Sequence, residues 1–559
     1  RDALWRILWV DVDPDGGDAA AVGGSMQGGD DAGRALAVGG EGDGARGSAA
    51  RALARALAQV HDRNGRLRLI PPESFHAPEL FRQDDAGGGD RSSSVDAFLD
   101  EATNPVNGAG DKKRTAAGGF RRNRAAELLR RAPILVPFGA RVRWFKNSIF
   151  RDRNDHAGRG GPMEAFGFTP EHHIQVTRGR VFADALDALG PAALKHENRR
   201  WRDDHVGERP PGSLKGVVRV NFVNEHGVEE AGVDGGGLFK DFLSALIEEA
   251  FDPKVGLFVE TPDRTLYPNP ASWKHAGADH LRKLEFLGAM LGKAVYEGIL
   301  VDLPLAGFFL AKLRDGRPPE LNDLATLDPE LYHHLLSLKR LPARDVEDLF
   351  LHFTASDPDG VGGDVDLIPG GSEIRVDGEN RGRYVHLLAH HLMHARIRRQ
   401  SKAFVDGFRG LIEPSWLRVF APAELRLLIS GAGGKIDIDD LARSATYSGG
   451  YTADHPTVTA LWDALRECRE EDQRAFLKFV TACPNTPLLG FSQLMPPFCV
   501  HRSGMSSGSR ASEDTADLAR LPTAATCMNL LKLPPYKTKD AVKEKLLYAV
   551  TSGSGFDLS

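Results

Sequence analysis

Cysteine is rare in this chain, with four residues among 559, and no two of them form a CxxC pair. A disulfide scaffold needs dense, paired cysteines, and a zinc knuckle needs closely spaced cysteine pairs, so neither is expected here. Sparse thiols of this kind indicate a reducing compartment. We therefore expect the protein in the cytoplasm or the nucleus.

Long hydrophobic runs and a strong net charge are also missing. The longest apolar candidate, residues 132–138 (APILVPF), is far shorter than the roughly 18 residues of a membrane-spanning helix. Lys and Arg number 71 against 77 Asp and Glu, which gives a formal net charge of −6. A chain so close to neutral carries no global basic footprint for nucleic acid. We therefore expect neither a membrane span nor a nucleic-acid partner.

The composition changes near residue 130. Residues 11–50 contain 12 Gly and 9 Ala, so small residues fill more than half of this stretch. Such a composition offers little apolar area to offset the entropy lost on ordering. We therefore predict that residues 1–129 form an extension that is largely disordered or linker.

Periodicity beyond residue 130 predicts an α+β fold. Residues 217–222 (VVRVNF) alternate as a strand does. Residues 151–168 are Gly-rich and predict a loop, and residues 447–456 (YSGGYTADHP) predict a hinge. Apolar spacings of three and four predict helices over residues 182–189, 238–251, 280–300, 384–402, 423–428, 457–467, 471–480 and 538–550. The resulting architecture is a large helical lobe, a hinge and a small α/β lobe.

Cys527 is a candidate nucleophile because it lies in a Pro-punctuated segment, LPTAATCMNLLKLPPY, and not in a periodic apolar element. Its neighbours Thr526 and Asn529 can form local hydrogen bonds. A structural thiol is the alternative interpretation. Cys483 and Cys499 also border Pro-rich turns, and position alone does not exclude them.

A thiol hydrolase would need a histidine to take the proton of the nucleophile. No histidine follows Cys527, and the nearest one before it is His501. A histidine distant in sequence could still lie near Cys527 in space. Hydrolysis therefore stays open as an alternative, although no motif supports it.

Four histidines, His386, His390, His391 and His394, lie on one predicted helix. The spacing of four places three of them on one face, as in a helical zinc site. However, HHLMH has His391 where the zinc-protease motif HExxH needs its glutamate. We therefore predict a half-buried packing face and no metal site, with metal binding as the alternative.

Two shorter motifs have structural interpretations as well. Residues 174–180 (IQVTRGR) resemble the opening of a calmodulin-binding IQ motif, but the second half is missing. We predict instead a strand that enters the helix over residues 182–189. Residues 235–237 (GGG) could cradle a phosphate before a helix, but they fit neither GxxxxGK[ST] nor GxGxxG. A tight turn is the favoured interpretation.

Five motifs occur in order, and together they resemble a known family. They are RVNFVNEHGVEEAGVDGGGLFKDF, LGKAVYEGILVDLP, TYSGGYTADHP, FVTACPNTPLLGFSQLMPPF and LPTAATCMNLLKLPPY, and the chain ends GFDLS. This series resembles the catalytic domain of HECT-type ubiquitin-protein ligases. It is most similar to the subclass whose larger members carry an N-terminal IQ motif. The resemblance covers about residues 130–559.

The resemblance implies a bilobal HECT domain and a ubiquitin-protein transferase. The N-lobe would be residues 130–446, with conjugating-enzyme binding within residues 301–402. Residues 447–456 would be the hinge, and residues 457–559 the C-lobe. Ubiquitin would pass from a charged ubiquitin-conjugating enzyme to Cys527 as a thioester and then to substrate lysines. The implied partners are ubiquitin, a ubiquitin-conjugating enzyme, protein substrates and the proteasome pathway, and no cofactor or metal is implied.

The resemblance also assigns residues to roles. Thr526 and Asn529 would support the nucleophile, and Phe556 and Asp557 would act in transfer to lysine. Gly449 and Gly450 would be the hinge points. The groove for the conjugating enzyme would be formed by Leu331, Leu335, Leu338, Leu341, Leu349, Leu351, Tyr384 and Leu388. Ordinary core packing is the alternative for these groove residues, of which Leu349 and Leu351 would lie on a strand.

This chain departs from the family pattern in three places. Many members have a histidine two positions before the nucleophile, where this chain has Ala525. The aromatic residue that often follows the nucleophile is Met528 here. Residues 1–129 match no known pattern, so the choice of substrate is not implied. A non-catalytic scaffold of the ubiquitin pathway remains the alternative function.

Overall fold

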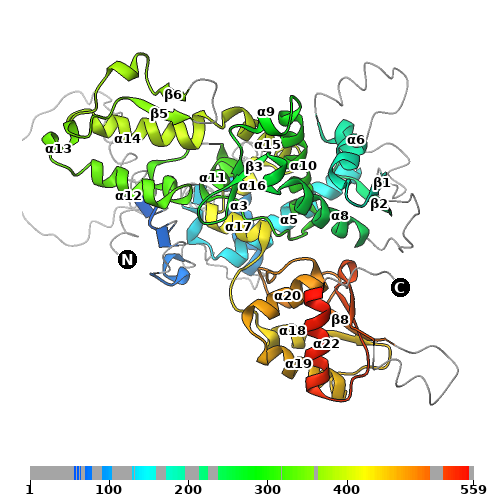
Figure 1. Cartoon of the computed structure of the whole chain (residues 1–559). Helices are drawn as coiled ribbons and strands as arrows, with labels where there is room; N and C mark the ends of the chain where they lie inside the picture. The colour runs from blue at the N-terminus through cyan, green and yellow to red at the C-terminus, as the bar shows by residue number, and fades with distance from the viewer. Residues whose placement is uncertain are drawn as a thin grey trace, which may run out of the picture. The chain divides into compact units, whose positions relative to one another are not determined.

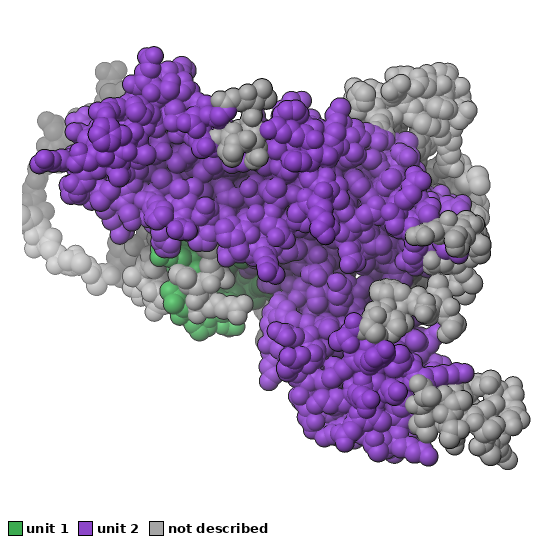
Figure 2. Space-filling model, in the orientation of Figure 1, with its two compact units in different colours: residues 1–148, 415–423 green, residues 149–414, 424–559 purple. Residues whose placement is uncertain are grey.

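The computed structural model describes the chain over a set of ranges that fall in two compact units (Figure 2). One unit is residues 1–148 with 415–423, and the other is residues 149–414 with 424–559. The described residues are 56–57, 59–61, 63–64, 69–77, 91–103, 129–130, 132–158, 171–194, 213–224, 237–316, 318–357, 363–503 and 520–552. Most of the predicted extension, residues 1–129, lies outside these ranges. Every helix in the described ranges is too short or too polar to cross a bilayer.

The first unit is built around a buried arginine on a long helix. Its elements are η1 (Pro72–Phe75), α3 (Arg91–Thr103), η4 (Pro133–Leu135) and the start of α5 (Phe138–Gly158). Arg141 on α5 donates to the carbonyl oxygens of Val136 and Val419 at 2.9 and 2.7 Å. Its guanidinium also lies over the rings of Phe138 and Phe420. These bonds satisfy a charge that would otherwise be costly to bury.

Helix α5 continues through Gly158, so the loop predicted for residues 151–168 is wrong for its first eight residues. The loop was predicted from the glycines of this segment, and these begin only at Gly158, where the helix ends. The structure shows that its polar side chains have distant partners. Asp152 accepts bonds from Lys215 Nζ at 2.6 Å and Tyr296 Oη at 2.9 Å. Arg153 pairs with Glu297 at 2.8 Å.

After the end of α5, the second unit continues with two strands and two helices, each of which the sequence predicted, and the structure shows that the strands pair. β1 (Glu171–Thr177) pairs in parallel with β2 (Val217–Val223), and α6 (Val181–Ala193) joins them in sequence. The strand prediction for residues 217–222 is confirmed, as is the strand that enters a helix after residue 174. α8 (Gly237–Ala250) confirms the helix predicted over residues 238–251.

Two helices cross at glycines in the core of this unit. On α10 (His280–Glu297), a Cβ added to Gly288 would lie 2.0 Å from the Phe404 carbonyl oxygen. On α15 (Arg398–Phe408), a Cβ added to Gly407 would lie 1.9 Å from the Glu285 carbonyl oxygen. No side chain fits at either position, so the two backbones are in direct contact. The helix predicted over residues 280–300 is confirmed.

The predicted helix over residues 384–402 is two helices, α14 and α15, joined by a π-helix and a turn at residues 396–397 (Figure 1). The other elements of this unit are η6 (Pro253–Val255), β3 (Phe258–Glu260), β4 (Leu266–Pro268), α9 (Ser272–His275), α11 (Gly307–Asp315), η7 (Leu321–Thr326), α12 (Pro329–Leu338), α13 (Ala343–Glu347), β5 (Thr354–Asp357), β6 (Gly363–Asp366), η8 (Gly371–Glu373), α14 (Arg381–His390), the π-helix η9 (His391–Ala395) and most of α17 (Pro422–Ser430), whereas α16 (Pro414–Leu417) belongs largely to the first unit. We call residues 149–414 with 424–430 the helical lobe.

The C-terminal elements form a mixed sheet with helices, coloured orange to red in Figure 1. The sheet has the order β7–β8–β10–β9, in which only β9 is antiparallel to its neighbour. The elements are α18 (Ile438–Ser444), β7 (Thr446–Ser448), α19 (Pro456–Glu467), α20 (Glu470–Thr481), η10 (Phe491–Gln493), β8 (Cys499–Arg502), β9 (Thr523–Ala525), η11 (Thr526–Met528), β10 (Leu530–Leu533) and α22 (Lys539–Ser552). Helices with small sheets confirm the predicted α+β fold.

The core of this sheet includes residues that precede the predicted hinge. Ile436, Ile438 and Leu441 are buried in the same cluster as Val500 and Leu531. A residue that packs in this core moves with it. We therefore use the name small lobe for residues 436–552, which begin well before the boundary predicted at residue 457.

The predicted hinge at residues 447–456 thus lies inside the small lobe. β7 pairs with β8, and Tyr451 Oη donates to the Leu533 carbonyl oxygen at 3.0 Å. Gly449 and Gly450, the predicted hinge points, have φ of +68° and +95° and form the turn after β7. Two adjacent glycines are compatible with a tight turn and with a flexible linker, so the sequence alone does not distinguish these two structures.

Residues 431–435 (GAGGK) connect the two lobes. Gly431 and Gly434 have φ of +78° and +124°, which side-chain-bearing residues rarely adopt. Ala432 exchanges backbone hydrogen bonds with Thr486 of the small lobe at 2.9 and 3.1 Å. Arg474 of α20 also donates to the Gly434 carbonyl oxygen at 3.1 Å. The glycines therefore give the segment torsional freedom, while hydrogen bonds at Ala432 and Gly434 bind it to the small lobe.

Candidate active site

Cys527 lies on a tight turn between two paired strands. β9 ends at Ala525, η11 covers Thr526–Met528, and β10 begins at Leu530. Asn529 has a φ of +45°, the left-handed region that asparagine tolerates better than most residues. We call residues 526–529 the Cys527 turn. The backbone of Cys527 is described, whereas its side chain lies outside the described atoms.

Asn529 fastens this turn to the sheet. Its side chain is only 1% exposed, and its Nδ2 donates to the Pro496 carbonyl oxygen at 2.7 Å. Its own carbonyl oxygen accepts from the backbone N–H of Cys499 at 2.9 Å. The sequence predicted local hydrogen bonding for Asn529, and the structure shows bonds to a segment about thirty residues away in the chain. The residue therefore fixes the conformation that presents Cys527.

Two charged residues of α8 hold the other side of the turn. Lys240 Nζ donates to the Thr526 carbonyl oxygen at 3.2 Å and to Asn529 Oδ1 at 2.9 Å. Thr526 Oγ1 donates to the Asp241 carboxylate, and Thr526 is only 5% exposed. The small lobe is thus docked on the helical lobe through the turn that carries Cys527.

Lys240 and Asp241 were not predicted as site residues. They lie in the motif GGGLFKDF, in which Leu238 and Phe239 separate them from the glycines at the start of α8. A Lys-Asp pair on a helix is usually a solvated face, so composition and spacing gave no reason to single it out. Its role depends on a contact between segments nearly three hundred residues apart.

The other cysteines differ in burial and surroundings. Burial raises the pKa of the Cys483 thiol to about 11 and also raises the pKa of Cys468. Both residues are therefore thiols, not thiolates, at neutral pH, which makes them weak nucleophiles. Cys499 is half-buried, and its Sγ lies 3.3 Å from Ser448 Oγ. His501 shares that hydroxyl through its Nδ1 at 2.9 Å.

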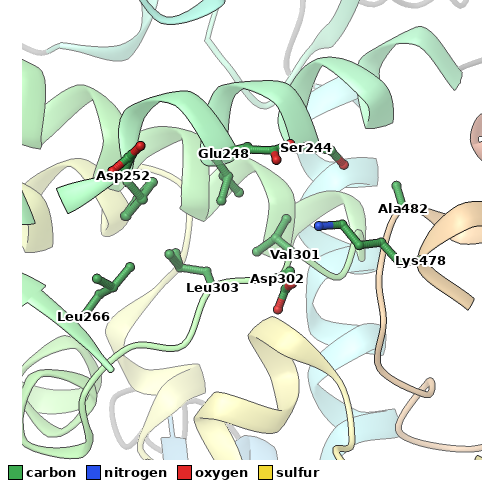
Figure 3. Close-up of a pocket in the computed structure, with 11 residues that line it drawn as sticks. Ser244, Glu248, Asp252, Leu266, Val301, Asp302, Leu303, Lys478 and Ala482 are labelled. Carbon is green, nitrogen blue, oxygen red and sulfur yellow. The ribbon is translucent and has the colours of Figure 1, made fainter. Parts of the chain in front are cut away.

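A cavity of about 300 Å³ lies beside α8 (Figure 3). Ser244 and Glu248 of α8 line it together with Asp252, the N-cap of η6, and Asp302 lines it from the segment after α10. Lys478 of α20 extends into the cavity from the small lobe. Ser244 and Glu248 lie four and eight positions after Lys240, so a single face of α8 borders both the Cys527 turn and this cavity.

The predicted groove residues lie on the elements from α12 to α14, and three of them are core residues. Leu335, Leu338 and Tyr384 are buried, and the Tyr384 ring packs edge-on against Phe353 at 5.6 Å. Burial also raises the pKa of the Tyr384 hydroxyl. For these residues the structure favours the core interpretation. The half-buried groove residues are Leu331, Leu341, Leu351 and Leu388.

An apolar surface remains at the turn after α13. Leu349 is 50% exposed and Phe350 is 64% exposed. Leu349 and Leu351 lie before β5 and not on a strand, which corrects the sequence prediction. Phe350 has a φ of +50°, and the Arg375 guanidinium lies 4.7 Å from its ring centre. Phe350 was not among the predicted groove residues, although it lies between two of them, Leu349 and Leu351.

The histidine-rich helix is only in part the half-buried packing face that the sequence predicted, because His386 and His390 are exposed, whereas His391 and His394 are half-buried. The rings of His390 and His394 lie 4.8 Å apart, and His391 begins the π-helix. Burial, with Lys312, His390 and Arg398 nearby, lowers the pKa of His394 to about 4, so its ring is neutral at physiological pH. No group of three or more potential metal ligands occurs in the ranges that the structure covers.

The last helix, α22, begins after Thr538, as predicted. The Thr538 hydroxyl accepts a hydrogen bond from the Ala541 N–H at 3.2 Å, which is the bond expected of an N-cap. The description ends at Ser552. Phe556 and Asp557 therefore lie outside the described residues, and their roles stay predictions.

Comparison with known proteins gives consistent matches. A family model described as HECT-domain (ubiquitin-transferase) matches residues 244–559. The E3 ubiquitin-protein ligase UPL6 of Arabidopsis thaliana is 43% identical over 437 residues, which are 78% of this chain and 39% of that protein. Ubiquitin-protein ligase E3B of Homo sapiens is 39% identical over 465 residues, 78% of this chain and 41% of that protein. The E3 ubiquitin-protein ligase HUL5 of Saccharomyces cerevisiae is 36% identical over 450 residues, 78% of this chain and 46% of that protein. The chain thus spans less than half the length of these relatives.

Proposed function

Because the chain belongs to the HECT-domain family of ubiquitin transferases, we propose that it carries ubiquitin as a thioester on Cys527. Ubiquitin comes from a charged ubiquitin-conjugating enzyme and goes on to lysines of protein substrates. The observation that carries this proposal is the Cys527 turn. It is a strained turn, fixed by Asn529 on one side and by Lys240 and Asp241 on the other.

The first step exchanges one thioester for another, which is close to thermoneutral. A free cysteine has a pKa of about 8.5, so a few per cent is thiolate at neutral pH. That fraction is sufficient when the leaving group is also a thiolate, and no dedicated histidine is needed. The position of Ala525 two residues before Cys527 is consistent with this, because alanine offers no base. The protein mainly has to orient the thiol.

The second step is harder because a lysine amine, with a pKa of about 10.4, must lose a proton before it attacks. Docking of the small lobe on α8 places the Asp241 carboxylate beside the turn, where it can stabilise an incoming cation. Asp557, from the segment beyond the described residues, is the further candidate. Holding the amine and the thioester together supplies much of the rate.

Loading requires that the small lobe leave α8 and bring Cys527 to the conjugating enzyme. The segment 431–435 supplies the torsional freedom for this movement. Leu349 and Phe350 provide exposed apolar side chains on the helical lobe for the conjugating enzyme to contact. We place the reaction in the cytoplasm or nucleus, upstream of proteasomal degradation.

A thioester trap tests the proposal. The chain is mixed with a panel of charged conjugating enzymes, and adducts are compared with and without reductant. Cys527→Ala should remove the reductant-sensitive ubiquitin adduct, while Cys468→Ala, Cys483→Ala and Cys499→Ala should keep it. If no member of the panel gives an adduct, the chain is a scaffold. Loss of free ubiquitin thioester without any adduct would indicate a hydrolase.

A further inference from the structure

A residue of the small lobe caps a helix of the helical lobe. The carbonyl oxygen of Ser430, the last residue of α17, accepts a hydrogen bond from Asn485 Nδ2 at 2.8 Å. The last carbonyl groups of a helix have no partner inside the helix, and residues next to the helix end usually satisfy them. Ser430 is held in the helical lobe, where its Oγ donates to the Leu303 carbonyl oxygen at 3.0 Å. The bond from Asn485 therefore joins the two lobes directly.

The neighbours of Asn485 contact the segment that connects the lobes. We call residues 483–486 (CPNT), which follow α20 in the chain, the clasp. Thr486 exchanges two backbone hydrogen bonds with Ala432, and its Oγ1 donates to the Ala432 carbonyl oxygen at 3.0 Å. A Cβ added to Gly431 would lie 2.7 Å from the Thr486 carbonyl oxygen. The clasp thus lies directly against the backbone of residues 430–432.

Arg474 of α20 holds the far end of the same segment. Its guanidinium donates to the Gly434 carbonyl oxygen at 3.1 Å and pairs with Glu470 at 3.0 Å. Ser430, Ala432 and Gly434 are therefore all bonded to the small lobe. Because Ser430 itself belongs to the helical lobe, a large rotation of the small lobe about residues 431–435 must break at least its bond with Asn485.

We propose that the clasp controls the balance between the docked and the open arrangement of the lobes, with Asn485 as its positioning residue. With the clasp closed, the small lobe stays on α8, where Cys527 discharges to lysine. With the clasp open, residues 431–435 are free to rotate, and Cys527 reaches the conjugating enzyme. The inference rests on the proposed function, because it assigns loading and discharge to different arrangements of the lobes.

Removal of the Asn485 amide should favour the open arrangement. Ser430 is 7% exposed in the docked lobes, so its carbonyl oxygen would lose the bond from the small lobe and gain little water in return. Opening of the clasp lets water reach this oxygen, so the loss destabilises mainly the docked arrangement. When the lobes exchange faster than ubiquitin is transferred, loading follows the open population and discharge follows the docked population. The ratio of the two rates then reports the ratio of the two populations.

Rates measured on the full chain test the role of Asn485. Loading is measured as thioester formation on Cys527 from a limiting amount of charged conjugating enzyme. Discharge is measured in a single-turnover chase of the preloaded chain with free lysine. In Asn485→Ala, we expect loading to rise and discharge to fall, so that the ratio of the two rates increases about fivefold, or about 1 kcal/mol. A merely structural defect would instead slow both steps.

A matched pair of threonine variants provides a second test. Thr486→Val keeps the branched shape but removes the Oγ1 bond to Ala432, so it should change the ratio of rates in the same direction. Thr459→Val, at an exposed position of α19 in the small lobe, should leave the ratio unchanged. The Tm of each variant shows whether the small lobe is folded.

Hydrogen exchange tests the clasp without any transfer reaction. The backbone N–H groups of Ala432 and Thr486 are each bonded across the clasp, so one opening should expose both of them. In Asn485→Ala, we expect exchange at both amides to accelerate about fivefold, while the amides of α22 in the small lobe keep their wild-type rates.

The two measurements separate failure of the clasp from failure of the proposed function. If the thioester forms, an unchanged or lower ratio of loading to discharge in Asn485→Ala would refute the role of the clasp and leave the proposed function intact. If Asn485→Ala does not fold, the ratio in Thr486→Val decides in the same way. If the wild-type chain forms no thioester, the proposed function fails and hydrogen exchange alone decides. Wild-type exchange rates in the variant would then refute the clasp, and faster exchange at both amides would support it.

Discussion

Asp241 and Thr526 are 285 positions apart, and the Thr526 hydroxyl donates a hydrogen bond to the Asp241 carboxylate. This bond and those of Lys240 join the helical lobe to the residue that precedes Cys527. Hydrogen bonds to a charged acceptor are worth roughly 1.5–3 kcal/mol, more than a neutral pair provides. The docked arrangement of the two lobes should therefore depend on the charge of Asp241.

Asp241→Asn should weaken docking and slow discharge from Cys527 to free lysine about tenfold, or about 1.4 kcal/mol of barrier. The amide keeps the shape of the carboxylate but loses its charge. A single-turnover chase from preloaded enzyme measures discharge separately from loading. Asp364→Asn, an exposed aspartate on β6 of the helical lobe, serves as the matched control. Equal discharge rates in Asp241→Asn and the wild type would show that docking through this bond has no part in the second step.

Phe350→Ala should slow loading of Cys527 about tenfold, with little change in Tm, because an exposed aromatic anchor contributes to binding and not to the core. Leu335→Ala should instead lower Tm markedly, since truncation of a buried leucine costs about 2–5 kcal/mol. Thioester formation and thermal unfolding are measured on both variants. A large Tm loss in Phe350→Ala would mean that this side chain has a structural role.

Gly434→Ala should slow transfer from the conjugating enzyme to Cys527 while leaving the affinity for that enzyme unchanged. The φ of +124° at Gly434 is not available to alanine, although nothing lies within 4 Å of an added Cβ. Gly449→Ala should destabilise the small lobe, because its Cβ would lie 2.9 Å from the His501 ring. Normal loading by Gly434→Ala would place the motion between lobes elsewhere.

Lys312 should make stability depend on pH in the alkaline range. Burial lowers its pKa from 10.5 to about 8, so between these values the unfolded chain holds a proton that the folded chain has lost. Folding stability attributable to Lys312 therefore rises with pH across this window, by up to about 1.4 kcal/mol per pH unit. As the pH is raised from 8 to 10.5, the Tm of the wild type should fall less steeply than the Tm of Lys312→Met, or should rise. Lys254→Met is the exposed control, and parallel pH profiles for all three proteins would contradict the prediction.

Deletion of residues 556–559 should leave loading of Cys527 nearly normal and slow discharge to lysine at least tenfold, roughly 1.4 kcal/mol of barrier. The physical reason is that an apolar Phe556 on a Ser/Gly tether is unfavourable in water unless it docks. Asp557 would then be placed near the reaction. Full-rate discharge by the truncated chain would remove the tail from the mechanism.

Sequence patterns predicted the elements whose formation depends on local periodicity. β2, α8 and α10 were predicted because their apolar residues recur at strand or helix spacing, and α22 was predicted from the N-cap at Thr538. The helical end of α5 was missed because Asp152 is stabilised by Lys215 and Tyr296, which are remote in the chain. Partners at such separations leave no periodic signal.

The residues of the candidate site also fall into two groups, those that a local motif could predict and those that depend on contacts between remote segments. Cys527, Thr526 and Asn529 could be selected from one short motif because they share a turn. Lys240 could not, since its contact with that turn exists only after the lobes fold and dock. Gly449 and Gly450 were misassigned because composition does not distinguish a turn within a sheet from a link between lobes.

Because the cavity beside α8 is lined by both lobes, separation and docking of the small lobe should change the amount of water bound to the protein. A volume of about 300 Å³ holds on the order of ten water molecules, at roughly 30 Å³ each. Its walls belong to both lobes, with Glu248 on one and Lys478 on the other. When the lobes separate, these charged groups take up more solvent, and when the lobes dock that solvent is released. Osmolytes that are excluded from protein surfaces therefore favour the docked state, so osmotic pressure should slow loading and favour discharge.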